Sequence, residues 1–302
     1  MIVVKELYKL FGRVKALDKV NMIVPKGICG LIGPNGAGKT TLIHILAGLI
    51  KPDSGRVEVL GMDPWSQRYE LMRRMGFLLE KPVFPMNITA MRYILHVARA
   101  KGLPDDEAVE ALRKANLLNH AERKISGYSA GMKVRLGLAK AMIGKPELVV
   151  LDEPTANLDP SGRIELLKLI KTMHRDEGAS FLISSHVLPE LQKVCSWVCL
   201  MNEGRVIEQG FVEDLLDKYA SKTYAIRVSK PRELAEALSS LNSLKVRLCE
   251  NTVYVKGDAS IIRRTLPNLI LQTGNEMLGF RQLGRSLENV FLKALEEKTH
   301  GG

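Results

Sequence analysis

The chain has 302 residues, with 44 Lys and Arg against 33 Asp and Glu and only four cysteines. This length allows one large domain and a smaller one. The net positive charge favours anionic partners such as phosphates, nucleic acid or an acidic membrane surface. A generally basic soluble protein is equally compatible with this charge. The cysteines lack zinc-type CxxC spacing, which favours a reduced cytosolic protein, and the lack of a signal peptide and of any run of about 18 apolar residues predicts no membrane span.

The first 216 residues alternate between strand-like apolar runs and helical patterns. The strand-like runs are GICGLIG, MGFLLE, ELVVLDEP, ASFLISSH and SWVCLMNEGRVIEQG. Such alternation is typical of helices packed on a mainly parallel sheet, so we predict an α/β domain.

A phosphate-binding loop follows the first of these runs. GPNGAGKT, residues 33–40, matches G-x-x-x-x-G-K-[ST], with the apolar run ICGLI before it and the helical pattern TTLIHILAGL after it. Backbone N–H groups of such a loop surround phosphate oxygens, Lys39 reaches the β- and γ-phosphates and Thr40 binds magnesium. The alternative is a glycine-rich turn without a ligand. The predicted nucleotide-binding residues of this segment are Gly33, Asn35, Gly36, Gly38, Lys39, Thr40 and Thr41.

Further along the chain, two segments add candidate chemistry. In YSAGMKVRLGLAKAMIGKP, small residues precede a predicted helix. The partial positive charge at the amino end of this helix suits an anion. The alternative is that the small residues only form a tight start of the helix and bind no ligand. In ELVVLDEP, four apolar residues lead to Asp152 and Glu153. By itself this pair is usually a strand end meeting solvent. Beside a phosphate loop, however, Asp152 is expected to hold magnesium and Glu153 to polarise the attacking water.

A different pattern begins after DKYASK. TYAIRVS alternates with period two, PRELAEALSSL is helical, and KVRLCENTVYVKG indicates a hairpin turning at Glu250 and Asn251. Two more helices are predicted in ASIIRRTLPNLI and SLENVFLKALEEK. We therefore predict an ATPase-like domain over residues 1–220, with a helical part at about 82–145, and an α+β domain of ferredoxin-like pattern over 221–302.

The order of these motifs resembles the ATP-binding subunits of ABC transporters, over residues 1–210. YSAGM stands at the place of the family's signature, and NLDP, which includes Asp159, resembles its D-loop. His186, at the end of SSH, resembles the family's switch histidine, which contacts the γ-phosphate. Phe11 lies where the family has an aromatic that stacks on adenine. Each feature has a simpler explanation on its own, namely a core phenylalanine, a turn or a packed histidine.

The resemblance implies a P-loop NTPase fold with a mainly parallel sheet, an antiparallel N-terminal β part, a helical subdomain and the small C-terminal α+β domain. It also implies a dimer that holds two ATP and Mg²⁺, in which Ser129 and Gly131 of one subunit meet the ATP of the other. Asp159 of the D-loop is a further nucleotide-binding residue that the resemblance implies. Catalytic roles fall on Lys39, Glu153 and His186, and metal binding on Thr40, Asp152 and Glu80. Glu80 departs from the family pattern, since it replaces a glutamine and lacks the amide donor, and Tyr128, Ala130 and Met132 depart from the usual signature.

The tail GFRQLGRSLENVFLKAL is similar to the C-terminal extension of exporter ATPases of the drug-resistance, sodium-efflux and copper-processing branches. This similarity implies an export subunit, peripheral on the cytoplasmic face of the cell membrane, whose helical subdomain contacts an integral membrane permease. One alternative is a soluble ABC ATPase acting on nucleic acid or ribosomes, but no nucleic acid partner is expected, because neither a second ATPase cassette nor a long coiled coil is present. The other alternative, nucleotide binding without turnover, is disfavoured by Glu153 and His186.

Overall fold

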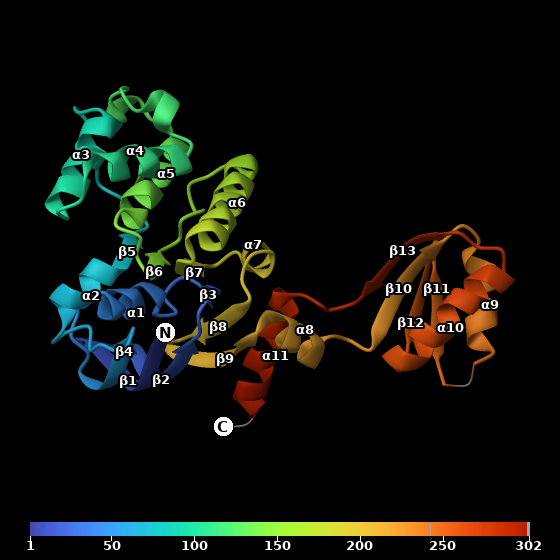
Figure 1. Cartoon of the computed structure of the whole chain (residues 1–302). Helices are drawn as coiled ribbons and strands as arrows, with labels where there is room; N and C mark the ends of the chain where they lie inside the picture. The colour runs from blue at the N-terminus through green and yellow to red at the C-terminus, as the bar shows by residue number, and fades with distance from the viewer. Residues whose placement is uncertain (242, 301–302) are drawn as a thin grey trace. The chain divides into compact units, whose positions relative to one another are not determined.

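The computed structural model describes residues 1–241 and 243–300, and it consists of two compact units, Met1–Val212 and Glu213–Gly302 (Figure 1). Residues 242, 301 and 302 of the predicted C-terminal domain lie outside the described residues. The predicted boundary between the two domains follows residue 220. In the structure the boundary between the two units comes earlier, after Val212, at the start of α8 (Val212–Tyr219). No helix in the described part of the chain is long and apolar enough to span a bilayer.

A six-stranded sheet forms the centre of the first unit, in the order β5-β6-β7-β3-β8-β9. Neighbouring strands pair in parallel except β8 and β9, which form an antiparallel pair. Every residue of β3, β6 and β7 is buried, as expected for apolar strands covered on both faces. The strands are β3 (Ile28–Ile32), β5 (Met75–Leu78), β6 (Leu148–Leu151), β7 (Ser180–Ser185), β8 (Trp197–Asn202) and β9 (Arg205–Phe211). The mainly parallel sheet predicted from the sequence is confirmed.

An antiparallel sheet of β1 (Ile2–Phe11), β2 (Val14–Val24) and β4 (Ser54–Val59) forms the N-terminal part, in the order β2-β1-β4. Its inward residues share one hydrophobic core with β3 and with α1 (Lys39–Leu46). This core fixes the start of α1 directly after β3, where the phosphate loop lies. Three further helices belong to the unit: α2 (Arg68–Arg74), α6 (Pro160–Glu177) and α7 (Leu188–Gln192).

The helical part of this unit has a core of its own, built from residues between Phe84 and Ile143. Thr89 caps one helix and Ser129 another, each by accepting a hydrogen bond from a backbone N–H of the first turn. The elements are α3 (Ala90–Ala100), α4 (Asp105–Lys114), the 3₁₀ turns Leu118–His120 and Ile125–Gly127, and α5 (Ala130–Met142).

The second unit contains a four-stranded antiparallel sheet in the order β11-β12-β10-β13, with the chain order β-α-β-β-α-β of a ferredoxin-like fold, as predicted. The elements are β10 (Thr223–Val228), α9 (Pro231–Ser239), β11 (Lys245–Cys249), β12 (Thr252–Lys256), α10 (Ala259–Gln272) and β13 (Met277–Gln282), followed by α11 (Leu287–His300). The hairpin turns at Glu250 and Asn251, as expected. Strand β13 was not predicted, because its mostly exposed residues show no apolar alternation.

Candidate functional site

The loop between β3 and α1 has a backbone that only glycine can follow. Gly36 and Gly38 have φ values of 81° and 98°, and a Cβ atom on Gly38 would lie 2.5 Å from the carbonyl oxygen of Ala16. A Cβ atom on Gly33 would lie 2.4 Å from the carbonyl oxygen of Met201. Side chains at Gly33 and Gly38 would therefore displace the loop from β8 and β2, the strands to which these carbonyl groups belong.

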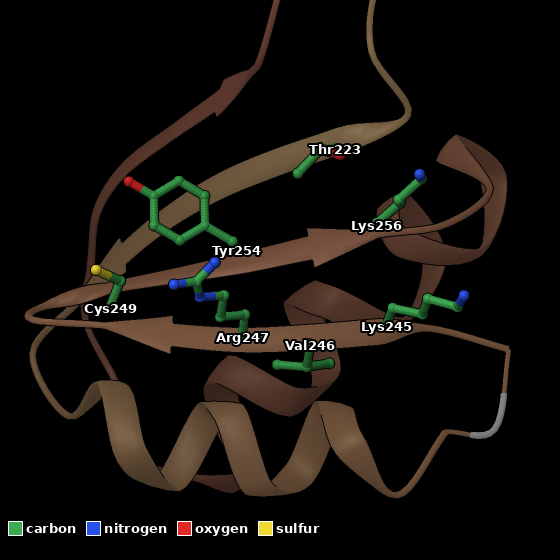
Figure 2. A pocket seen from close by; sticks show the side chains of 7 residues that line it. All are labelled: Thr223, Lys245, Val246, Arg247, Cys249, Tyr254 and Lys256. Carbon is green, nitrogen blue, oxygen red and sulfur yellow. The ribbon is translucent and has the colours of Figure 1, made fainter.

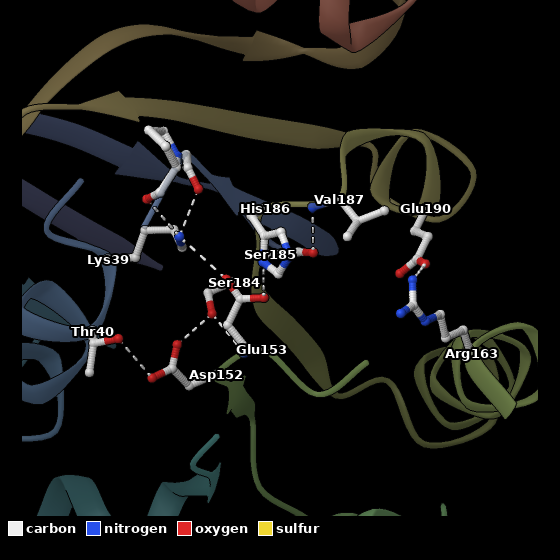
Figure 3. Close-up of polar contacts among 12 residues, drawn as sticks. Lys39, Thr40, Asp152, Glu153, Arg163, Ser184, Ser185, His186, Val187 and Glu190 are labelled. Atoms are coloured by element: carbon white, nitrogen blue, oxygen red, sulfur yellow. Dashed lines mark hydrogen bonds and ion pairs between the residues drawn. The ribbon is translucent and has the colours of Figure 1, made fainter. Parts of the chain in front are cut away.

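Lys39 is held against this loop. Its Nζ donates to the carbonyl oxygens of Gly33 and Pro34, at 2.7 and 3.1 Å, and lies 3.3 Å from Oε1 of Glu153 (Figure 3). The lysine is only 6% exposed. An ammonium group fixed at the mouth of a phosphate loop is positioned to bind an anion that enters it.

Asp152 follows β6 and lies beside the start of α1. Its Oδ2 accepts from the Thr40 hydroxyl at 3.2 Å and its Oδ1 from the Ser184 hydroxyl at 2.5 Å (Figure 3). The aspartate is 1% exposed, and among residues 1–241 and 243–298 no Lys, Arg or His side chain pairs with it. A buried carboxylate with hydroxyl partners and no counter-cation fits a Mg²⁺ ion, which prefers oxygen ligands and takes the remaining ones from substrate phosphates and water.

Glu153 turns away from Asp152 because its backbone adopts a left-handed conformation, with φ of 46°. Its backbone N–H donates to Ser184 Oγ at 2.8 Å, and its Oε2 lies 2.9 Å from Nδ1 of His186. The two adjacent carboxylates therefore lie in different surroundings (Figure 3). The Asp152 carboxylate lies beside Thr40 at the start of α1, and the Glu153 carboxylate lies beside Lys39 and His186. This separation lets a metal ligand and a general base act at the same strand end.

A pocket of about 440 Å³ lies above these groups. It brings together nine of the residues predicted from the sequence: Asn35, Gly36, Gly38, Lys39, Thr40, Thr41, Glu80, Glu153 and His186. Val14, Lys15 and Ala16 also line it. No sequence motif predicts a role for these three residues, although they lie in the same segment as Phe11. Phe11 itself is outside the lining and is 47% exposed, with Nζ of Lys9 5.4 Å from its ring centroid, so it is not a core residue.

Phe11→Ala is expected to weaken ATP binding by about 1 to 3 kcal/mol, the contribution of stacking a base on an aromatic ring. Phe11→Tyr keeps the ring and should bind ATP like the native protein. Equilibrium binding of ATP to both variants measures the difference. Because the side chain is half exposed, its loss should leave the fold intact, and an unchanged affinity in the alanine variant would show that the adenine contact is elsewhere.

Ser129, Gly131 and Asp159 are not brought to this pocket. Ser129 Oγ accepts from the backbone N–H of Met132 at 3.2 Å and so caps α5. Asp159 caps α6, and hydrogen bonds from the Ser161 hydroxyl and the Gly162 N–H hold the pKa of its carboxyl below the usual value. Both helix ends are therefore capped by their own side chains and lie outside the lining of the pocket of their own chain.

Ser184, the first residue of SSH, is a site residue whose role no local sequence pattern predicts. Its buried hydroxyl donates to the carboxylate of Asp152 and accepts from the backbone N–H of Glu153. Ser184→Ala removes a donor to buried Asp152 and an acceptor for the Glu153 N–H, so we expect a loss of about 1 to 3 kcal/mol of stability and a marked loss of turnover.

Ser185→Ala is the matched control for this change. It removes a neighbouring buried hydroxyl that, within the described residues, accepts from the backbone N–H of Val187, at 3.0 Å, and contacts neither Asp152 nor Glu153 by a hydrogen bond. Thermal unfolding and ATP turnover of both variants are the measurements. Equal turnover in the two variants would contradict a positioning role for Ser184.

The fold and the site together define a P-loop nucleoside triphosphatase. A family model described as ABC transporter matches residues 17–156. Over 301 residues the chain is 39% identical to the bacitracin transport ATP-binding protein BcrA of Bacillus licheniformis. The alignment covers 98% of this chain and 97% of that protein. It is 38% identical over 208 residues to the lantibiotic transport ATP-binding protein SrtF of Streptococcus pyogenes, covering 68% of this chain and 89% of that one.

Among solved structures, cbiO1 from Clostridium perfringens, part of the ABC transporter complex cbiONQ, matches with a TM-score of 0.66 at 28% identity, over 72% of this chain and 90% of that one. The chain belongs to the family of ABC transporter ATP-binding proteins and is an ATPase. The predicted family, fold class and enzyme class are confirmed.

Proposed function

We propose that this chain hydrolyses ATP, with Mg²⁺, at a site shared between two subunits and thereby drives a separate membrane permease that exports its substrate. The observation that carries this proposal is the arrangement of Lys39, Glu153 and His186 around one pocket, with Asp152 buried beside Thr40. A phosphate cradle alone needs only the loop and the lysine. The additional carboxylate and imidazole support turnover of the bound nucleotide as well as binding.

In the proposed site, Lys39 and the loop N–H groups bind the phosphates, and Thr40 and Asp152 hold the magnesium. Glu153 accepts a proton from the attacking water, since its carboxylate is held by His186 and Lys39 at the pocket wall. His186, whose side chain is 46% exposed, can reach the γ-phosphate. Glu80 lines the same pocket and is positioned to contact the metal or its water.

The proposed partner ATPase subunit supplies the other half of each site. Ser129 and Gly131 lie at the amino end of α5, where N–H groups and the helix dipole favour an anion, yet they do not line the pocket of their own chain. Binding a second subunit head to tail would place this helix end against the partner's ATP. Asp159, at the start of α6, would approach the same interface.

Export by a permease is supported by the relatives named for transport of bacitracin and of lantibiotics. We infer that the cargo is a peptide antibiotic, and that the subunit works at the cytoplasmic face of the cell membrane. The helical part between Phe84 and Ile143, with its own core, is the proposed contact with the permease. Action on nucleic acid or ribosomes is the less favoured function, because the named relatives are transport proteins.

Purification of the tagged chain from membranes, followed by identification of the accompanying proteins, tests this function. A multispanning membrane protein that copurifies, and phosphate release that requires Mg²⁺, are expected. Copurification with ribosomes or DNA instead, or ATP binding without phosphate release from the assembled complex, would overturn the proposal.

A further inference from the structure

The sheet of the second unit has one face packed against helices and one face left open. Alternate residues point to opposite faces of a strand. The covered face packs against α9 and α10 and carries the apolar residues Tyr224, Ile226, Val228, Val253 and Val255. The open face carries the residues between them, and five of these are exposed cations: Arg227, Lys245, Arg247, Lys256 and Arg281.

The strand register places two of these cations side by side. Lys245 lies directly opposite Lys256, and Arg247 lies opposite Tyr254 in the next row of the same face. Like charges directly opposite each other on neighbouring strands destabilise a sheet. Within the part of the chain that the structure describes, no carboxylate forms an ion pair with any of the five cations. A local arrangement that costs stability without a compensating partner is typical of a binding site.

A pocket of about 450 Å³ lies on this face (Figure 2). Lys245, Arg247 and Lys256 line it, together with the half-buried Tyr254. In Figure 2 the guanidinium group of Arg247 points toward the ring of Tyr254, and the two lysines lie at the other end of the same strands. The pocket volume is in the range of small-molecule sites, and its lining combines three cations with one aromatic wall.

We propose that this pocket binds a phosphorylated group, with Lys245, Arg247 and Lys256 contacting the phosphate and the Tyr254 ring contacting the organic part. Three cations around one cavity match a dianionic or more highly charged phosphate better than a single carboxylate. The guanidinium of Arg247 forms paired hydrogen bonds to phosphate oxygens, and the lysines add charge. The phosphate belongs either to a soluble metabolite or to the headgroup of an acidic phospholipid, and the experiment below separates these two sources.

Cys249 provides a local readout, because it lines the pocket and is exposed, whereas Cys29, Cys195 and Cys199 are buried. The rate of its alkylation by N-ethylmaleimide, followed by mass spectrometry of the full chain, reports occupancy of this pocket and not of the phosphate loop. Inorganic pyrophosphate is the soluble probe, with sodium chloride at equal ionic strength as reference. Vesicles of phosphatidylcholine with and without phosphatidylglycerol are the lipid probe.

We expect protection of Cys249 by pyrophosphate or by the acidic vesicles, and loss of that protection in Lys245→Ala/Arg247→Ala/Lys256→Ala. The matched control is Arg232→Ala/Arg263→Ala/Arg264→Ala, which removes three exposed cations from α9 and α10 of the same unit and should keep the protection. Protection by pyrophosphate identifies a soluble ligand, and protection by acidic vesicles alone identifies a headgroup. Thermal unfolding of the triple variants, followed by circular dichroism, verifies that the altered unit remains folded.

Three results would overturn the proposal. The first is alkylation of Cys249 that neither probe slows beyond the salt reference. The second is protection that persists in the pocket variant or disappears equally in the control. The third is protection by a single-stranded oligonucleotide without protection by pyrophosphate or vesicles, which would make the open face a nucleic-acid surface.

Discussion

Glu153→Gln is expected to slow ATP hydrolysis by about two to four orders of magnitude, the usual contribution of a general base. The amide keeps the shape of the side chain and can still bond to His186, but it cannot accept a proton from water. Removal of a negative charge beside Lys39 leaves the phosphate site intact, so ATP affinity should be preserved. The variant should therefore accumulate in an ATP-bound dimer, which size-exclusion chromatography with ATP and Mg²⁺ detects.

Glu80→Gln is the matched control, because it makes the same chemical change at another carboxylate of the same pocket. Glu80 stands where the family pattern has a glutamine, and within the described residues it forms no hydrogen bond or ion pair with His186, so a variant with the amide at this position should retain most of its turnover. Phosphate release measured under saturating ATP compares the two variants. Near-native turnover of Glu153→Gln with magnesium present would show that another group activates the water.

A second large effect is expected when two inactive variants are mixed. Lys39→Ala removes the ammonium group from the phosphate loop. In the proposed dimer, Gly131→Asp places an anion where the start of α5 approaches the γ-phosphate of the partner's ATP. Each variant alone should be almost inactive. In a mixed dimer both lesions fall in one composite site, and the other site joins an intact Lys39 to an intact Gly131, so part of the activity should return.

The structure makes Gly131→Asp a clean test of function. A Cβ atom at Gly131 would contact only Leu158 Cδ2, at 3.7 Å, so there is room for a side chain in the free subunit. The added carboxylate lies in the first turn of α5, where the helix dipole favours negative charge. The variant should therefore fold normally, and thermal unfolding of the free chain checks this point before any mixing.

Mixed dimers must be demonstrated by pull-down with two different tags. A tandem-linked dimer with a single Lys39→Ala lesion supplies the other control, since it shows whether one working site is sufficient for turnover. If mixed dimers form and one site is sufficient, yet no activity returns, then the loop and the helix end act within one chain. In that case the role proposed for Ser129 and Gly131 is wrong.

Local sequence patterns are sufficient to predict the class of protein and most of the residues that line the pocket. The spacing of GPNGAGKT specifies a phosphate loop because the backbone around Gly36 and Gly38 needs conformations that other residues avoid, so the function can be recognised from a local pattern. Apolar runs likewise predicted the parallel strands and placed Asp152 and Glu153 at a strand end. These features depend on neighbours in the chain.

Tertiary structure decided the features that depend on distant segments. Ser184 joins Asp152 and Glu153 only because β6 and β7 are adjacent and parallel, a pairing that no local pattern of SSH indicates. Strand β13 forms because β10 offers it an edge, although its own residues lack alternation. Arg281 of β13 joins Lys245 and Lys256 on one face only because β10 pairs with both β12 and β13, since side chains far apart in the sequence share a face only after strands pair.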